Sequence, residues 1–252
     1  MVSSSYSSDY SPSIAYFSRS LVDKYEFARM PMPELFYVSG PSSSFSVEYN
    51  SNEEHSGNYF CAHSFSPSIF LSPSRPKARF VGENDEAIRI AEEVFELMNG
   101  RKFPDNISIN ILPLHDFQLV HSQFGSWSNG IMGFSINGKR KVVFVKENSL
   151  DELLIVIGHE IGHVMTETLP NRHDEEAKAF AFSIEWAKTI KKHNIANLGS
   201  SIKDSLDFQP VKNGLHDVSF GFVDFMIKRG RKALQLHDDL IKRYLSVFDR
   251  IY

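Results

Sequence analysis

The stretch VIGHEIGHVM, residues 156–165, carries two histidines and one glutamate within a run of uncharged residues. His159 and His163 are four positions apart, and Glu160 directly follows the first histidine. Four residues turn an α-helix by about 400°, so both imidazoles lie within about 40° of each other on one face. Burying such groups without a partner costs several kcal/mol. This HExxH pattern therefore predicts a metal site on a buried helix.

The sequence around this stretch defines the helix. Ser149 and Glu152 have the spacing of a capping box, which predicts a helix from Leu150 to about Thr168. Pro170 ends it. Its middle is apolar on all sides, as is typical of a helix at the centre of a domain.

A third metal ligand is expected at the start of the next helix, because a catalytic zinc site has three protein ligands and one open position. This helix is expected over residues 174–192, and it opens with Asp174, Glu175 and Glu176. On a helical wheel, Glu176 lies at the centre of the apolar face and Asp174 on the solvent face. Glu176 is the preferred ligand. Glu175 and Asp174 stay open, because acidic residues at a helix N-terminus are also stabilised by the helix dipole.

The same wheel predicts the surroundings of Glu176. Ala179 and Ser183 share its face and are small, so they would let two helices approach closely. The solvent face, beside Asp174, is expected to carry Lys178, Glu185, Lys188, Thr189 and Lys192.

Hydrophobic periodicity predicts the remaining elements. Asn137-Gly138 is a strong hairpin signal, because both residues tolerate positive φ. The expected elements are a helix over 84–99, strands over 107–111, 131–136 and 141–145, and helices over 218–228 and 232–248. Together they predict an α+β fold. A small mixed sheet with an edge hairpin packs on the HExxH helix and the glutamate helix, and C-terminal helices follow.

Composition divides the chain into two parts. Serine accounts for 21 of the first 80 residues, and prolines are interspersed. We therefore expect residues 1–80 to form an irregular extension rich in Ser, Pro and aromatic residues. Residues 81–252 are expected to form the folded domain, with its C-terminal helical segment.

Charge and cysteine content exclude several classes of protein. The net charge of −4 argues against a nucleic-acid binder driven by bulk charge. Cys61 is the single cysteine, so no internal disulfide is possible. No apolar run reaches the roughly 20 residues that span a bilayer. The N-terminus lacks the pattern of a secretory signal, so a cytoplasmic location is expected. The oligomeric state stays open.

The order of elements, with HEIGH on one helix and Glu176 on the next, resembles zincin metallopeptidases of the gluzincin type. The resemblance extends to minimal gluzincins, to ImmA/IrrE-like peptidases and to the core of HtpX-like peptidases. It implies that His159, His163 and Glu176 bind one Zn²⁺ and that Glu160 is the catalytic base. It also implies a peptide or protein substrate. One departure is Phe180, which stands where related families often have Asp or Asn.

The resemblance further implies that the strand over 131–136 is the edge strand of the cleft, to which an extended substrate adds. A rival hypothesis is a non-proteolytic regulatory or binding protein that keeps the fold and has its cleft covered by the terminal segments. His216 and Tyr244 could stabilise an oxyanion, although their spacing does not single them out. His237 is expected to be a core residue, and His173 a surface residue.

Overall fold

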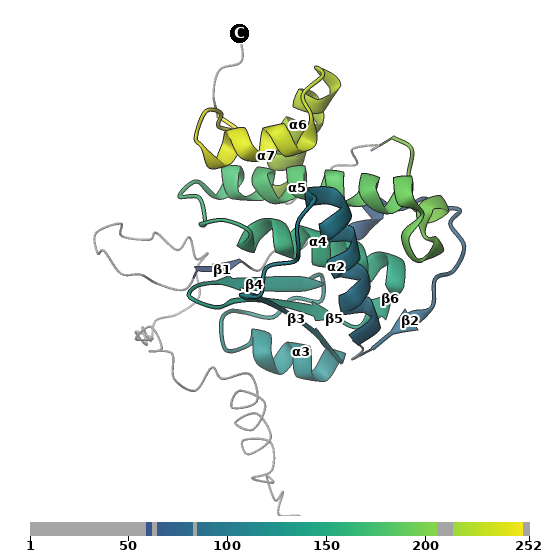
Figure 1. Cartoon of the computed structure of the whole chain (residues 1–252). Coiled ribbons are helices and arrows are strands. Elements are labelled where there is room, and N and C mark those ends of the chain that lie inside the picture. The colour runs from purple at the N-terminus through teal and green to yellow at the C-terminus, as the bar shows by residue number, and fades with distance from the viewer. Residues whose placement is uncertain (1–58, 62–64, 83–84, 206–213, 249–252) are drawn as a thin grey trace, which may run out of the picture. The chain divides into compact units, whose positions relative to one another are not determined.

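A four-stranded mixed sheet lies within the unit formed by Gly57–Tyr252 in the computed structural model of the chain (Figure 1). The structure describes residues 59–61, 65–82, 85–205 and 214–248. A separate unit, Met1–Ser56, lies outside the described residues, as does Asn84, the first residue of the helix predicted over 84–99.

The sheet has the order β1-β4-β5-β3. β4 (Gly133–Asn137) and β5 (Lys141–Lys146) form the antiparallel hairpin that the Asn-Gly pair predicted. β3 (Ile107–Leu112) is parallel to β5, and β1 (Tyr59–Cys61) is antiparallel to β4. The prediction that β4 is an edge strand is therefore wrong, because β1 pairs along its outer side.

Helices cover both faces of this sheet (Figure 1). α4 and α2 lie on one face, α3 lies on the other, α5 packs on α4, and α6 and α7 pack on α5. This arrangement confirms the predicted α+β class. The helix bounds are α2 Asp85–Asn99, α3 Leu114–His121, α4 Leu150–Val164, α5 Arg172–His193, α6 Leu215–Lys228 and α7 Ala233–Ile241.

The remaining elements are short. β2 (Phe80–Val81) pairs with β6 (Asn148–Ser149), directly before α4. Single 3₁₀ turns lie at Pro67–Ile69, Ile195–Asn197 and Gly199–Ser201. Among the described residues, no helix combines the length and the apolar character that crossing a membrane requires.

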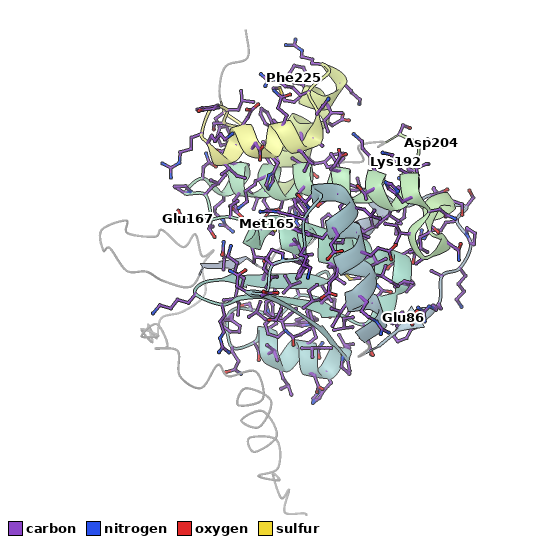
Figure 2. All side chains as sticks on the ribbon, in the orientation of Figure 1. Glu86, Met165, Glu167, Lys192, Asp204 and Phe225 are labelled. Atoms are coloured by element: carbon purple, nitrogen blue, oxygen red, sulfur yellow. The ribbon has the colours of Figure 1, made fainter. Side chains whose placement is uncertain are left out.

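α4 is the central helix, and nearly all of its side chains are buried. Figure 2 draws the described side chains on the ribbon in the orientation of Figure 1. It begins at Leu150 as predicted and ends at Val164, one turn before the expected Thr168. Ser149 occupies the N-cap position, but its side chain makes no capping hydrogen bond. Asp151 instead accepts from the Glu152 backbone N–H, so the helix start differs in detail from a capping box.

Small residues let α4 and α5 approach closely, as the wheel predicted. A Cβ added to Gly162 would lie 2.9 Å from the Cα of Ala179, a distance that real Cβ contacts do not show. One added to Gly158 would lie 2.5 Å from the ring of Trp186. This close approach brings the first turn of α5 beside the two histidines of α4.

The predicted solvent face of α5 is right at Lys188 and Lys192, which are exposed, and wrong at two positions. Lys178 and Thr189 are buried, because α6 and α7 pack where solvent was expected. The Lys178 ammonium is satisfied within the protein, since it pairs with Glu175 Oε2 at 2.8 Å and donates to the backbone oxygens of His163 and Glu167.

The folded unit begins earlier than expected. Phe65, Phe70 and Leu71 are buried in the core, and Leu71 forms a β-bridge with Ile202. The expected boundary after residue 80 is therefore too late, since this segment buries its apolar side chains despite its serines and prolines. Nothing in the described part bears on residues 1–56.

Candidate metal centre

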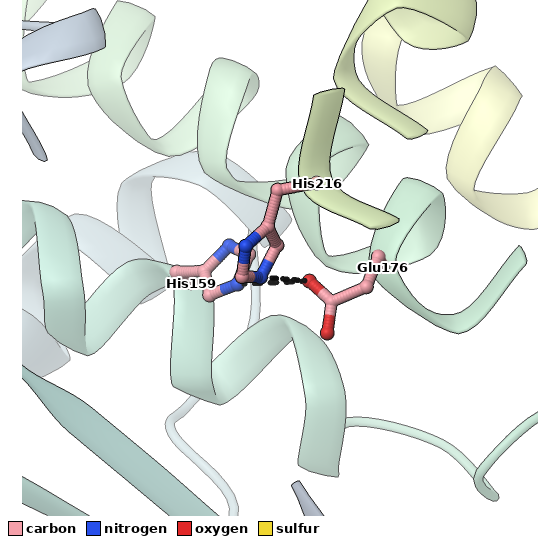
Figure 3. A group of neighbouring side chains, drawn as sticks. All are labelled: His159, Glu176 and His216. Carbon is pink, nitrogen blue, oxygen red and sulfur yellow. Dashed lines mark ion pairs between the residues drawn. The ribbon is translucent and has the colours of Figure 1, made fainter. Parts of the chain in front are cut away.

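Three helices bring their side chains together at one buried point (Figure 3). His159 comes from α4, Glu176 from α5 and His216 from α6, and their ligand atoms all lie within 4.8 Å of one another. Nε2 of His159 lies 3.5 Å from Oε2 of Glu176, and Nε2 of His216 lies 3.1 Å from the same oxygen. This buried group could hold a metal ion.

His163 approaches the same carboxylate from its other oxygen. Its Nε2 lies 3.7 Å from Oε1 of Glu176, and its ring stands at 90° to that of His159. His163 is outside the mutual group of His159, Glu176 and His216. The structure thus places both predicted histidines against Glu176, and it adds a third histidine.

These residues fit a zinc ion in ligand type and in their distances to Glu176. Zinc–ligand distances of about 2.0–2.1 Å imply about 3.3 Å between the ligand atoms of a tetrahedral site. The three histidine nitrogens lie 3.1–3.7 Å from the nearer oxygen of Glu176. Imidazole nitrogens with a carboxylate are a ligand set that zinc commonly takes in proteins.

Hydrogen bonds fix the tautomer of His159. The Ser183 hydroxyl donates to the backbone oxygen of Ala179 at 2.7 Å, so it accepts the hydrogen bond from Nδ1 of His159 at 3.2 Å. The proton on Nδ1 leaves the lone pair of Nε2 facing Glu176. Such support of the second ring nitrogen is usual for metal-binding histidines.

Glu175 supports His163 in the same way. Its Oε1 lies 2.9 Å from Nδ1 of His163, while its Oε2 accepts from the Leu169 backbone N–H and pairs with Lys178. Glu175 therefore orients a histidine from outside the group. Asp174 points elsewhere, because it accepts hydrogen bonds from the hydroxyl of Ser246 and the N–H of Val247. Of the three acidic candidates, only Glu176 lies against the Nε2 atoms of the histidines.

The charges of the group are coupled. Burial lowers the pKa of His159 to about 4, so its ring is neutral near pH 7. Burial also opposes protonation of His163, but the carboxylates of Glu176 and Glu175 outweigh it and raise the pKa to about 9. Burial alone would raise the pKa of Glu176, yet His163, His159 and His216 hold it well below its usual range. The buried carboxylate is thus an anion that attracts a cation.

Glu160 projects from α4 toward β4. Its side chain is 3% exposed, and its Oε2 is buried with no hydrogen-bond partner among the described residues. Burial raises the pKa of Glu160 to about 7, against the opposing effects of His163 and Ser135. Gly133 leaves the space that this side chain fills, since a Cβ there would lie 3.0 Å from Cγ of Glu160.

An aromatic side chain covers the group. Phe65 stacks on the ring of His159, with 4.1 Å between centroids and an interplanar angle of 8°. Phe180 lies 5.0 Å from the same ring. His159, His163 and Glu176 are each exposed by 3% or less. The group is therefore closed to solvent in this structure.

Sequence reasoning singled out the α4 histidines and Glu176 but not His216. Only the packing of α6 on α5 brings His216 in, and neither its spacing nor its flanks indicate this. His237 lies in the core, 5.5 Å from the ring of Phe182, as predicted. Tyr244 is 72% exposed, and the half-buried His173 packs against Phe248. The side chain of Cys61 lies outside the described set.

No protein-family model, no curated protein and no solved structure matches the chain. The resemblance to gluzincin metallopeptidases therefore stays a prediction from the motif and the order of elements.

Proposed function

We propose that the protein is a zinc-dependent metallopeptidase that hydrolyses peptide bonds. The observation that carries this proposal is the joint placement of His159 and Glu176, with Glu160 on the next position of the same buried helix. In this proposal His159, His163 and Glu176 bind one Zn²⁺. Bound zinc would lower the pKa of a water molecule and polarise the scissile carbonyl group.

Glu160 would act as the general base and then as the general acid. A group whose pKa lies near 7 can both accept and return a proton near neutral pH, and burial gives Glu160 such a pKa. It would accept a proton from the attacking water, whose oxygen bonds to the carbonyl carbon. As the C–N bond breaks, the same proton would pass to the leaving amine nitrogen.

The test is cleavage of a proteome-derived peptide library, followed by mass spectrometry. We expect the full chain to cleave peptides and Glu160→Gln to lose about 10²-fold or more of that activity, as removal of a general base does. Glu160→Gln should retain its zinc, because Glu160 is not a ligand. Cleavage that persists unchanged in Glu160→Gln would contradict the proposal.

A second candidate function is favoured by the closed site. Phe65 covers His159, and β1 occupies the outer edge of β4. In a non-proteolytic regulatory or binding protein that retains the fold, Phe65 and β1 would stay in these positions and the site would never open to a substrate. Zinc binding with no cleavage, both in the full chain and in the Phe65→Ala variant described below, would favour this alternative.

A further inference from the structure

The outer edge of β4 is occupied by a segment of the same chain. β1 pairs with β4 in antiparallel register, with Tyr59 opposite Asn137, Phe60 opposite Ile136 and Cys61 opposite Ser135. Strand addition of this kind uses main-chain hydrogen bonds, so the edge can accept an extended peptide of many sequences.

This edge leads directly to the proposed catalytic base. Ser135 lies opposite Cys61 on this edge. Gly133, on the same strand, borders Glu160, since a Cβ added there would lie 3.0 Å from Cγ of Glu160. A peptide lying along β4 would therefore pass beside Glu160, and β1 holds that position here.

Phe65 closes the path to the histidines. Its ring is 3% exposed and lies over His159, which is 1% exposed. The chain directly after it is anchored, because the Lys203 N–H donates to the oxygen of Phe70 and the Ser72 N–H donates to the oxygen of Ser201. β1 is only three residues long, so its release requires the loss of few hydrogen bonds.

We propose that Tyr59–Cys61, with Phe65 over His159, is a tethered segment that occupies the outer edge of β4 in place of a substrate. This inference rests on the proposed function, since it assigns to the segment the place of a substrate. Tethering gives the segment a high effective concentration, so a free peptide binds only when β1 leaves. The occupied state is therefore latent.

The pairing can be tested through the single cysteine. Directly opposite residues of antiparallel strands have Cα atoms about 4.5–5.5 Å apart, within the range of about 4.4–6.8 Å that a disulfide spans. In Ser135→Cys, oxidation should link Cys61 to the introduced thiol, as mass spectrometry of digested protein would show. The matched control is Ser108→Cys on β3, at the other edge of the sheet, which should form no internal link.

Zinc extraction by a chelator tests whether the segment closes the site, independently of catalysis. Zinc-loaded Ser135→Cys should lose its zinc about tenfold more slowly when oxidised than when reduced, a barrier difference near 1.4 kcal/mol. Phe65→Ala in the full chain should lose zinc about tenfold faster than the wild type. Phe103→Ala removes a half-buried ring that packs on Phe95, and should leave the rate unchanged.

The outcomes separate this inference from the proposed function. Failure of the disulfide to form in folded Ser135→Cys, or equal extraction rates in its two redox states, would overturn the occupied-edge proposal. If the link forms and slows extraction while no variant cleaves any peptide, the edge is occupied as proposed and the peptidase proposal fails. Faster peptide cleavage by reduced than by oxidised Ser135→Cys would support both.

Discussion

Glu176 differs from its acidic neighbours Glu175 and Asp174 in the side chains that its carboxylate contacts. Glu176 faces three histidines, and Glu175 hydrogen-bonds to Nδ1 of His163. Asp174 accepts a hydrogen bond from the Val247 N–H of the C-terminal segment. We expect Glu176→Ala to lower zinc affinity the most. Glu175→Ala should lower it by about 10- to 100-fold, as loss of an outer partner does, and Asp174→Ala should leave it unchanged. Competition titration with a chromogenic chelator measures all three, and an effect of Asp174→Ala larger than that of Glu176→Ala would disprove the assignment.

His216 gives a second prediction at the scale of one side chain. Its Nε2 lies 3.1 Å from Oε2 of Glu176, so His216 helps to orient that ligand, and we expect His216→Ala to weaken zinc binding by about 10- to 100-fold, as loss of an outer partner does. His237→Ala is the matched control, because His237 is equally buried at 6% exposure but lies outside the group. Equal affinities of the two variants would mean that His216 only fills space.

The residues of the site were partly predictable. Helical periodicity placed His159 and His163 on one face, and it turned Glu176 toward that face, since both inferences depend only on local geometry. His216 could not be predicted, because its position depends on how α6 packs on α5. The same packing buries Lys178, which local periodicity assigned to solvent.

The contact between α4 and α5 sets the distance between the histidines and Glu176. A methyl group on Gly162 would lie 2.9 Å from Ala179 Cα, so Gly162→Ala should reduce the free energy of unfolding by about 1–3 kcal/mol. Gly221→Ala on α6 is the control. With no atom within 4 Å of the added carbon, it should raise stability by about 1 kcal/mol through helix propensity. Urea denaturation measures both changes. Equal changes in the free energy of unfolding would show that α4 and α5 can move apart without loss of stability.

Sequence signals predicted most elements. Local signals predicted where these elements lie, such as the Asn-Gly pair for the hairpin and the apolar run for α4. The pairing of β1 with β4 was missed, because a strand of three residues has no periodicity to detect. The sequence analysis also placed Phe70 and Leu71 in an irregular extension, because the segment is rich in serine, although both side chains are buried.

At the scale of the whole molecule, His237 makes stability depend on pH. Burial, with the nearby Lys178 ammonium, lowers the pKa of His237 from 6.5 to about 4. Between these values the unfolded chain binds a proton that the folded chain does not, so stability falls as the pH decreases from about 6.5 to about 4. His237→Gln should lose less stability than the wild type over this window, and the exposed His193→Gln should behave like the wild type. If the free energy of unfolding changes equally with pH in His237→Gln and the wild type, His237 does not cause the pH dependence.

The measurement that tests the account most directly is the zinc content of the full chain, purified without chelators and determined by elemental mass spectrometry. We predict about one zinc per chain, because the described ligand atoms converge on a single point. The content should stay near one in Glu160→Gln and fall toward zero in His159→Ala. Clearly substoichiometric zinc in the wild type, with no gain on adding zinc, would contradict the metal centre and the function built on it.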